Sequence, residues 1–178
     1  MRKKKKVAVI GAGVSGLAAA NVFKQTGHAV SVFERSHDLG GVWEPSRSYP
    51  GIQTQSPKEL YRYTDKAMPA HYPEWPNGAQ VHEYLSSYAD NHDLRGLITF
   101  NTETSAMRRR TDGAPGWTLS LARNGEAATE ESFDFVAVCT GQFSEKNILT
   151  HPGQDAFTAG GGQVLHSSEY TDPALVGG

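Results

Sequence analysis

The stretch "KVAVIGAGVSGLAAA", residues 6–20, decides the fold of this chain. Residues 6–10 form a short apolar run with several β-branched side chains, which is typical of a buried parallel strand. The pattern of residues 14–26 predicts a helix with an alanine-rich face that ends at Gly27. Residues 29–34, "AVSVFE", predict a second strand, so a βαβ unit with two adjacent parallel strands is expected.

Three glycines, Gly11, Gly13 and Gly16, stand between the first strand and the helix. In a dinucleotide-binding turn the first allows the tight bend, the second lets a pyrophosphate approach the backbone, and the third lets helix and strand pack closely. The helix N-terminus then offers unpaired N–H groups and a partial positive charge to the phosphates. Glu34 lies 18 residues after Gly16, where an acidic side chain bonds the adenosine ribose. The set predicts a Rossmann-type site for FAD or NAD.

The stretch "LGGVW", residues 39–43, favours FAD over NAD. A flavin dinucleotide continues past its pyrophosphate into a ribityl chain and a flat tricyclic ring. The glycines Gly40 and Gly41 allow backbone N–H groups to come close to the phosphates and the ribityl chain, and Trp43 can pack near the ring. The alternative interpretation is a glycine turn followed by a core tryptophan.

The chain as a whole, residues 1–178, is expected to form one α/β domain with four parts. Residues 6–34 are the βαβ unit. Residues 35–78 are irregular and rich in Pro, Gly, Ser and Tyr, and so long an irregular stretch is often functional. Residues 79–141 are expected to hold a helix and a small β-meander, and residues 142–178 a linker.

Periodicity predicts the elements within residues 79–141. Residues 97–100, "LITF", and residues 133–141, "FDFVAVCTG", are expected to be strands, the second of them buried. Asn124-Gly125 is a strong hairpin signal. A helical face is expected to carry Val81, Tyr84, Leu85, Tyr88 and Ala89, and a half-buried strand Trp117, Leu119 and Leu121.

Composition excludes several function classes. Lys plus Arg is 17 and Asp plus Glu is 19, so no strong field favours a nucleic acid partner. No apolar run approaches the length of a membrane span, and the basic run of residues 2–6 is expected to be a solvated tail, as "MRRR" at 107–110 is expected to be an exposed strand end. The single cysteine, Cys139, excludes an internal disulfide and suits a reducing, cytoplasmic compartment. The histidines show no metal-ligand spacing, so no metal is expected.

Together these residues resemble the N-terminal part of a flavin-containing monooxygenase. The resemblance covers essentially all 178 residues. The family's identifying motif has Phe where this chain has Gly160, whereas Gly162, His166 and Tyr170 fit it. The stretches that carry the resemblance are "VAVIGAGVSGLAAA" with Glu34, "LGGVW", "TQSPKELY" (54–61), "EWPNGAQVHEYLSSYADNHDL" (74–94), "VAVCTG" (136–141) and "HSSEY" (166–170).

The resemblance implies a set of site residues. Gln55 matches a position that holds asparagine in many animal members, near the flavin, and it is the candidate catalytic residue. His166 is expected to cap or pin a loop rather than to transfer protons, and Cys139 to be an inert core thiol. The residues implied to bind FAD are Gly11, Ala12, Gly13, Val14, Ser15, Gly16, Glu34, Arg35, Gly40, Gly41, Val42, Trp43, Gln55, Thr140 and Gly141.

The resemblance also implies an activity. The full-length enzyme is expected to reduce FAD with NADPH and to transfer one oxygen atom from O2 to a soft nucleophile, an amine or a sulfide. Three alternatives stay open, namely Baeyer–Villiger oxidation of a ketone, a binding module without turnover, and an NAD(P)-dependent reductase without flavin. Residues 1–178 end before a second glycine-rich turn for NADPH. Alone they are therefore expected to bind FAD weakly or not at all, to be inactive, and to self-associate through exposed core surface.

Overall fold

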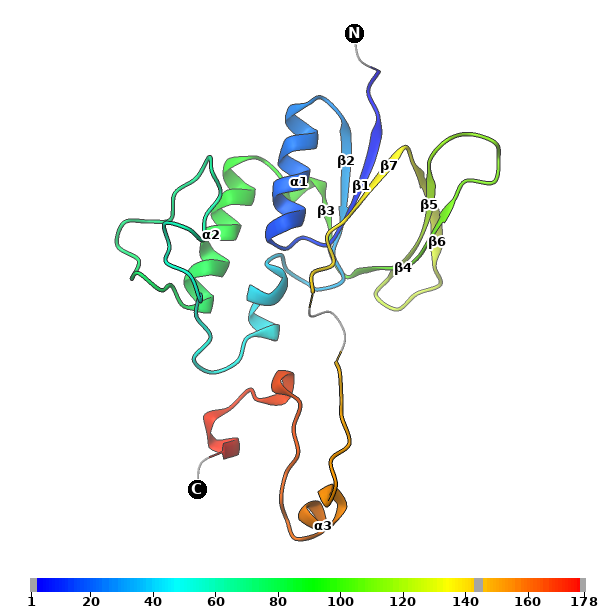
Figure 1. Ribbon diagram of the computed structural model, residues 1–178. Helices are drawn as coiled ribbons and strands as arrows, with labels where there is room; N and C mark the ends of the chain where they lie inside the picture. Colours follow the sequence, from blue (N-terminus) through cyan, green and yellow to red (C-terminus); the bar gives the residue numbers. More distant parts are fainter. Residues whose placement is uncertain (1–2, 143–145, 177–178) are drawn as a thin grey trace.

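The computed structural model describes residues 3–142 and 146–176, and it centres on a parallel sheet (Figure 1). The strand order is β3-β2-β1-β7. The βαβ unit is confirmed: β1 (Lys6–Ile10) pairs in parallel with β2 (Ala29–Phe33), and α1 (Val14–Gln25) connects them. The sheet continues through β3 (Ile98–Thr99) on one side and β7 (Phe135–Val138) on the other.

A three-stranded antiparallel sheet, the predicted β-meander, lies beside the parallel sheet (Figure 1). It consists of β4 (Thr102–Arg109), β5 (Trp117–Arg123) and β6 (Thr129–Phe133). The predicted turn between β5 and β6 is present, because Asn124 and Gly125 both have positive φ. The two sheets share a small core, formed by Ala8 and Phe33 of the parallel sheet with Leu119, Leu121 and Phe133 of the meander.

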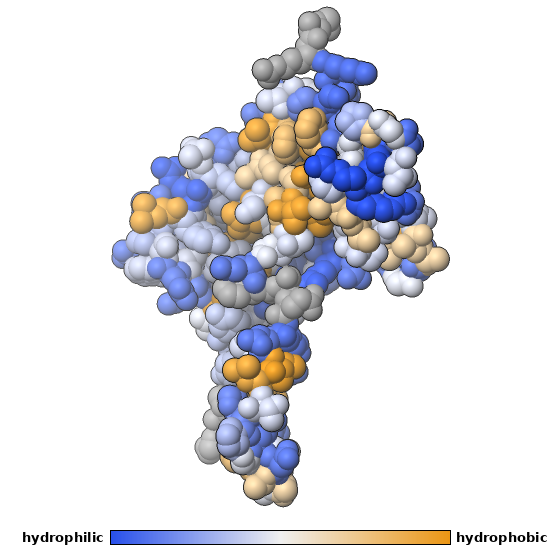
Figure 2. All heavy atoms as spheres, turned by 45° about the vertical axis from the view of Figure 1, so that its right-hand side comes forward, coloured by the Kyte–Doolittle hydropathy of each residue, from blue (hydrophilic) through white to orange (hydrophobic). Residues whose placement is uncertain are grey.

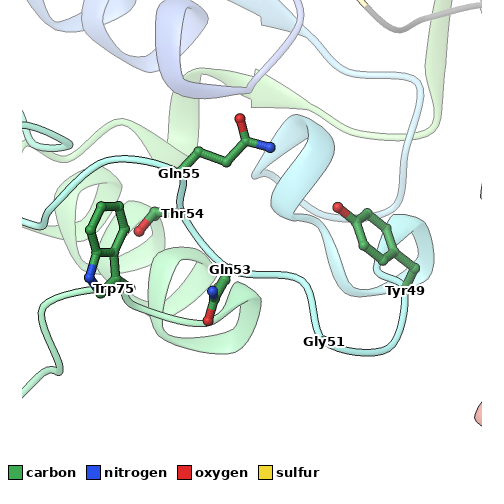
Figure 3. A pocket seen from close by; sticks show the side chains of 6 residues that line it. All are labelled: Tyr49, Gly51, Gln53, Thr54, Gln55 and Trp75. Carbon is green, nitrogen blue, oxygen red and sulfur yellow. The ribbon is translucent and has the colours of Figure 1, made fainter.

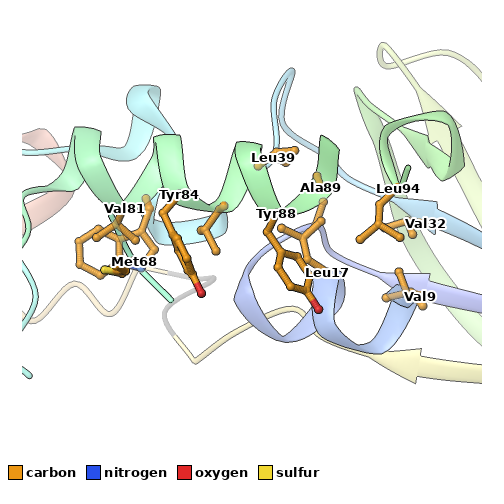
Figure 4. Packing of buried hydrophobic residues seen from close by; sticks show 14 of the residues in the cluster. Val9, Leu17, Val32, Leu39, Met68, Val81, Tyr84, Tyr88, Ala89 and Leu94 are labelled. Carbon is orange, nitrogen blue, oxygen red and sulfur yellow. The ribbon is translucent and has the colours of Figure 1, made fainter. Parts of the chain in front are cut away.

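The main core lies between the parallel sheet and two helices, α1 and α2 (Gly78–Asn91) (Figure 4). Asn77 caps α2 in a capping box, in which its side chain accepts from the N–H of Gln80 and the Gln80 side chain accepts from that of Asn77. The predicted apolar face of this helix is confirmed, since its members are all buried: Val81, Tyr84, Leu85, Tyr88 and Ala89.

Two strand predictions were partly wrong. The strand expected at 97–100 keeps only β3, because the 3-10 helix η3 (Arg95–Leu97) leads into it. The strand expected at 133–141 divides at Asp134, whose carboxylate accepts from the N–H of Lys6 at 2.8 Å and redirects the chain from β6 into β7. Nor is β7 buried. It is the edge strand of the described sheet, and Phe135 is 55% exposed.

The described residues after β7 are mostly exposed, and the C-terminal segment extends away from the sheet (Figures 1 and 2). It contains α3 (Gln154–Ala159) and the 3-10 helices η4 (Ser167–Glu169) and η5 (Pro173–Val176). The prediction that His166 pins a loop is confirmed, because its ring accepts from the N–H of Ser168 and caps η4. Within the described ranges, no helix is long and apolar enough to cross a membrane.

Candidate functional site

A cavity of about 450 Å³ lies at the carboxyl ends of β1, β2 and β7. β1 has β2 as its neighbour on one side, and the chain returns later as β7 on the other side of β1. Ligands of open α/β sheets usually bind at the carboxyl ends of the strands at such a point. Ile10, Phe33 and Cys139 contribute the strand ends. Most of the predicted site residues line this cavity: Gly11, Gly13, Val14, Ser15, Glu34, Arg35, Gly40, Gly41, Val42, Thr140 and Gly141.

Close backbone packing explains two of the three fingerprint glycines. A Cβ atom added at Gly16 would lie 2.9 Å from the carbonyl carbon of Gly11 and closer still to its oxygen. One added at Gly11 would lie 2.5 Å from the carbonyl oxygen of Cys139. Gly16 therefore allows α1 to rest on the turn, as predicted, and Gly11 allows the turn to rest on the chain after β7.

The N-terminus of α1 opens into the cavity. Its N-cap residue is Gly13, so no side chain caps the helix. Within the described part of the chain, no hydrogen bond involves the backbone N–H groups of Gly13, Val14 and Ser15. These three donors, together with the positive end of the helix dipole, suit a phosphate group.

The double glycine of "LGGVW" packs against the fingerprint turn. Gly40 donates its N–H to the carbonyl oxygen of Ala12 at 3.0 Å. Gly41 has φ +62°, and a Cβ atom added there would lie 3.2 Å from the Cα atom of Gly13. The two glycine segments thus meet backbone to backbone, so the bare backbone of Gly40 and Gly41 has a use in packing.

Glu34 is 6% exposed and ties the turn to β2. One carboxylate oxygen accepts from the N–H of Ala12 at 2.7 Å, and the other accepts from the N–H of Ser36 at 2.9 Å. Each carboxylate oxygen can accept a second hydrogen bond. Since Glu34 also lines the cavity, the geometry leaves room for a ligand hydroxyl to bond to it.

Trp43 lies in the core rather than on the cavity wall. It is 8% exposed, and its indole N–H donates to the hydroxyl of Tyr61 at 2.8 Å. The two rings meet edge to face with centroids 5.7 Å apart. Tyr61 lines the cavity in its place, and burial raises the pKa of its phenol. The interpretation of Trp43 as a core residue thus fits the structure, and Trp43 reaches the cavity only through Tyr61.

Sequence reasoning missed several lining residues. Tyr61 ends the stretch "TQSPKELY" and could have been found as its one aromatic residue. Cys139 also lines the cavity, and burial raises the pKa of its thiol, which agrees with an inert role. The remaining ones carried no local signal because packing between distant segments places them: Arg47, Thr102, Glu103, Thr104 and Gln142.

Gln55 lies apart from this cavity. It lines a second cavity of about 480 Å³, together with Gln53, Thr54 and Trp75 (Figure 3). The side chains of Gln53 and Gln55 point in opposite directions, as expected for alternate residues of an irregular extended segment (Figure 3). The structure therefore does not bring Gln55 into the lining of the cavity around Gly13, and its role near the flavin stays a prediction.

Comparison with known proteins gives this arrangement a family. The model of the family described as flavin-binding monooxygenase-like matches residues 4–178. The chain belongs to this family. It is 36% identical to human flavin-containing monooxygenase 1 over 182 residues, which are 96% of this chain and 34% of that protein. The chain thus spans about a third of the length of the curated relatives that it matches.

Solved structures of two monooxygenases share the fold of this flavin-binding monooxygenase-like chain. S-allyl-L-cysteine S-oxygenase from Allium sativum aligns with a TM-score of 0.74 and 25% identity, over 86% of this chain and 40% of that one. Steroid monooxygenase bound to NADP aligns with a TM-score of 0.71 and 29% identity, over 86% of this chain and 29% of that one. The predicted α/β Rossmann-type fold and the partial coverage of the family are both confirmed.

Proposed function

We propose that the cavity around Gly13 binds the pyrophosphate and adenosine of FAD. The observation that carries this proposal is the open N-terminus of α1, where three unpaired N–H groups face a cavity lined by bare glycine backbone. A Cβ atom at Gly13 would project into the narrow space beside Gly41. The residues present fit a phosphate, because it needs donors and close access and finds both here.

Each part of the cavity has a role toward the cofactor. The N–H groups of Val14 and Ser15 hold the pyrophosphate, and the carboxylate of Glu34 accepts from the ribose hydroxyls while it holds Ala12. Tyr61 forms a rigid wall, since the indole N–H of the buried Trp43 fixes its phenol. These residues orient the cofactor and keep water from part of it.

The full-length gene product, we propose, is an NADPH- and O2-dependent monooxygenase that transfers one oxygen atom to a soft nitrogen or sulfur nucleophile. Bound FAD supplies the electron transfer to oxygen. Two observations support the proposal, namely the family to which the chain belongs and the likeness to an S-oxygenase. Gln55 is proposed to lie at the edge of the flavin and to steady the activated oxygen with its amide, which both donates and accepts.

Gly13→Val tests the cofactor site in the full-length gene product. A branched side chain there enters the path of the pyrophosphate, so the purified variant is expected to lose its flavin absorbance. Gly96→Val is the matched control, because Gly96 is exposed and a Cβ atom added there meets nothing within 4 Å. Circular dichroism checks that both variants are folded. Normal flavin content in folded Gly13→Val would refute the assignment.

A further inference from the structure

Tyrosine rings lead from the wall of the cavity around Gly13 into the main core. Tyr61 lines that cavity, and it shares the lining of a smaller cavity of about 210 Å³ with Tyr63. The ring centroid of Tyr63 lies 3.8 Å from that of Tyr88 and 5.8 Å from that of Tyr84. Tyr84 and Tyr88 both belong to the buried face of α2 (Figure 4). We call Tyr61, Tyr63 and Tyr88 the tyrosine path.

Tyr63 is the central member of the tyrosine path. Burial contributes most to the raised pKa of its phenol, and the neighbouring phenols of Tyr88, Tyr84 and Tyr61 contribute in that order. Each of these phenols therefore lies close enough to Tyr63 to act on its ionisation. An electron can pass between aromatic rings at such short separations, so the path can connect the cavity with α2.

The phenol proton decides where an oxidised tyrosine can persist, because a tyrosine that loses an electron also gives up this proton. The hydroxyl of Tyr63 donates to the carbonyl oxygen of Val14 at 2.7 Å, and that of Tyr84 donates to the carbonyl oxygen of Lys66 at 2.6 Å. A backbone carbonyl accepts a hydrogen bond but does not take up a proton near neutral pH. Oxidation is therefore expected to move on from Tyr63.

Tyr88 differs because a carboxylate lies beside its hydroxyl. The hydroxyl donates to Asp65 at 3.4 Å and accepts from the side-chain amide of Asn21 at 2.7 Å. The amide is held in this orientation, since its oxygen accepts from Gln25 at 3.0 Å. Nε2 of His92 lies 3.4 Å from the same carboxylate, and the Asp65 side chain is 43% exposed. Asp65 can thus take the phenol proton and pass it to water.

We propose that Tyr88 is the site of a tyrosyl radical, which forms when a one-electron oxidant acts in the cavity around Gly13. The oxidant is an oxygen-derived radical or a light-excited flavin. It takes an electron from Tyr61, Tyr63 replaces that electron, and Tyr88 replaces the one that Tyr63 lost. The phenol proton of Tyr88 moves to Asp65. The products are the reduced oxidant, a neutral Tyr88 radical and a protonated Asp65.

The tyrosine path moves an oxidising equivalent away from the site of the cofactor. Tyr88 is 2% exposed and belongs to the main core rather than to the cavity wall. An oxidant that stayed in the cavity would attack the flavin or the side chains that hold it. The inference rests on the proposed function, since that function brings flavin and oxygen chemistry to this cavity.

Blue light tests the inference in the full-length gene product. Light-excited flavin takes one electron from a nearby aromatic side chain, and electron paramagnetic resonance of frozen samples detects a tyrosyl radical. The wild type is expected to give this signal. Tyr88→Phe is expected to lose most of it because the phenol is gone, and Asp65→Asn because the base is gone. The absence of a tyrosyl signal in flavin-containing wild type overturns the proposal.

Two further variants assign the signal to the tyrosine path. Tyr63→Phe keeps Tyr88 and Asp65 but places a ring that is much harder to oxidise between the cavity and α2, so it should also lose the signal. Tyr72→Phe is the matched control, since Tyr72 is buried and donates to the carboxylate of Glu83 at 2.8 Å but lies outside the path. It should keep the signal.

Circular dichroism checks that every variant is folded. A signal of wild-type size in folded Tyr88→Phe, Asp65→Asn or Tyr63→Phe overturns the proposal, as does its loss in folded Tyr72→Phe.

Flavin content, measured on the same samples, separates the two proposals. Flavin without a signal that depends on Tyr88 would refute this inference and leave the FAD site standing. A preparation without flavin would refute the FAD site. Azide radicals from pulse radiolysis then replace light, because they are small enough to enter the open cavity and they remove single electrons from tyrosine. A radical that depends on Tyr88 would leave this inference standing, and its absence would refute it.

Discussion

Gly16→Ala is the substitution that tests the fold most directly. In an exposed helix, alanine in place of glycine stabilises by about 1 kcal/mol. At Gly16 the added methyl group would lie 2.9 Å from the carbonyl carbon of Gly11, below the 3.0 Å that real Cβ atoms respect, and closer still to its oxygen. The obstacle is backbone, so the helix α1 must move away from the turn as a unit.

Overpacking of this kind costs about 1–3 kcal/mol, and more where the backbone cannot yield. Because Gly16 is buried and the obstacle is backbone, we take the upper end, and the gain in helix propensity leaves a net loss of about 2 kcal/mol. For a domain of this size, each kcal/mol lowers the melting temperature by roughly 2–4 °C. The expected shift is therefore about 4–8 °C.

Thermal and urea unfolding, followed by circular dichroism, measure the effect. Gly96→Ala is the control, since nothing lies within 4 Å of its added Cβ atom and no positive φ opposes alanine. It should change the free energy of unfolding by less than about 0.5 kcal/mol. If Gly16→Ala is as stable as Gly96→Ala or more so, α1 does not rest on the turn as described.

Three further predictions concern single groups. The Glu34→Gln variant of the full-length gene product should lose FAD, and its free energy of unfolding should fall by about 1–3 kcal/mol. The reason is that the amide nitrogen would face a backbone N–H that now donates a hydrogen bond to the carboxylate. Unchanged flavin content would contradict the ribose assignment. Gln55→Leu should release more hydrogen peroxide per NADPH consumed, and an unchanged coupling ratio would remove Gln55 from the flavin edge. The free energy of unfolding should fall as the pH rises above 10.0, because folding raises the pKa of several phenols above this ordinary value. Above pH 10.0 the phenols of the unfolded chain lose their protons while those of the folded chain still hold them, which favours the unfolded chain. Urea unfolding at rising pH with tyrosinate absorbance measures this. Constant stability there would contradict the raised phenol pKa of the buried Tyr72, Tyr84 and Tyr88 and of the half-buried Tyr61 and Tyr63.

The parts of the fold that depend on local sequence were predictable. The βαβ unit follows from a β-branched run, a glycine turn and an alanine-rich helix, and all three signals lie within 29 residues. The buried face of α2 follows from helical spacing, and the turn at Asn124-Gly125 from backbone conformations that few other residues adopt. In each case the residues that specify the element belong to the element.

What depended on distant packing was not predictable. Trp43 followed two glycines and suggested a flavin wall, but Tyr61 of another segment covers it and accepts its N–H. Residues 133–141 have the apolar composition of a buried strand, yet the carboxylate of Asp134 divides them, and β7 stands at the edge of the described sheet. The sequence shows how apolar a strand is, whereas the elements packed against the strand determine how much of its surface is buried.

The two glycine segments show why a sequence motif and a structural constraint are hard to separate. Gly40 and Gly41 were interpreted as access for a ligand, and yet their backbone lies against the fingerprint turn, with the N–H of Gly40 on the carbonyl oxygen of Ala12. A side chain at Gly41 would push on Gly13, which is the residue that a phosphate must approach. Packing and the proposed access of the cofactor thus require the same bare backbone. Loss of FAD in a Gly41 variant would therefore not show contact with the ligand, whereas Gly13, which itself faces the cavity and precedes the open helix N-terminus, gives the more direct test.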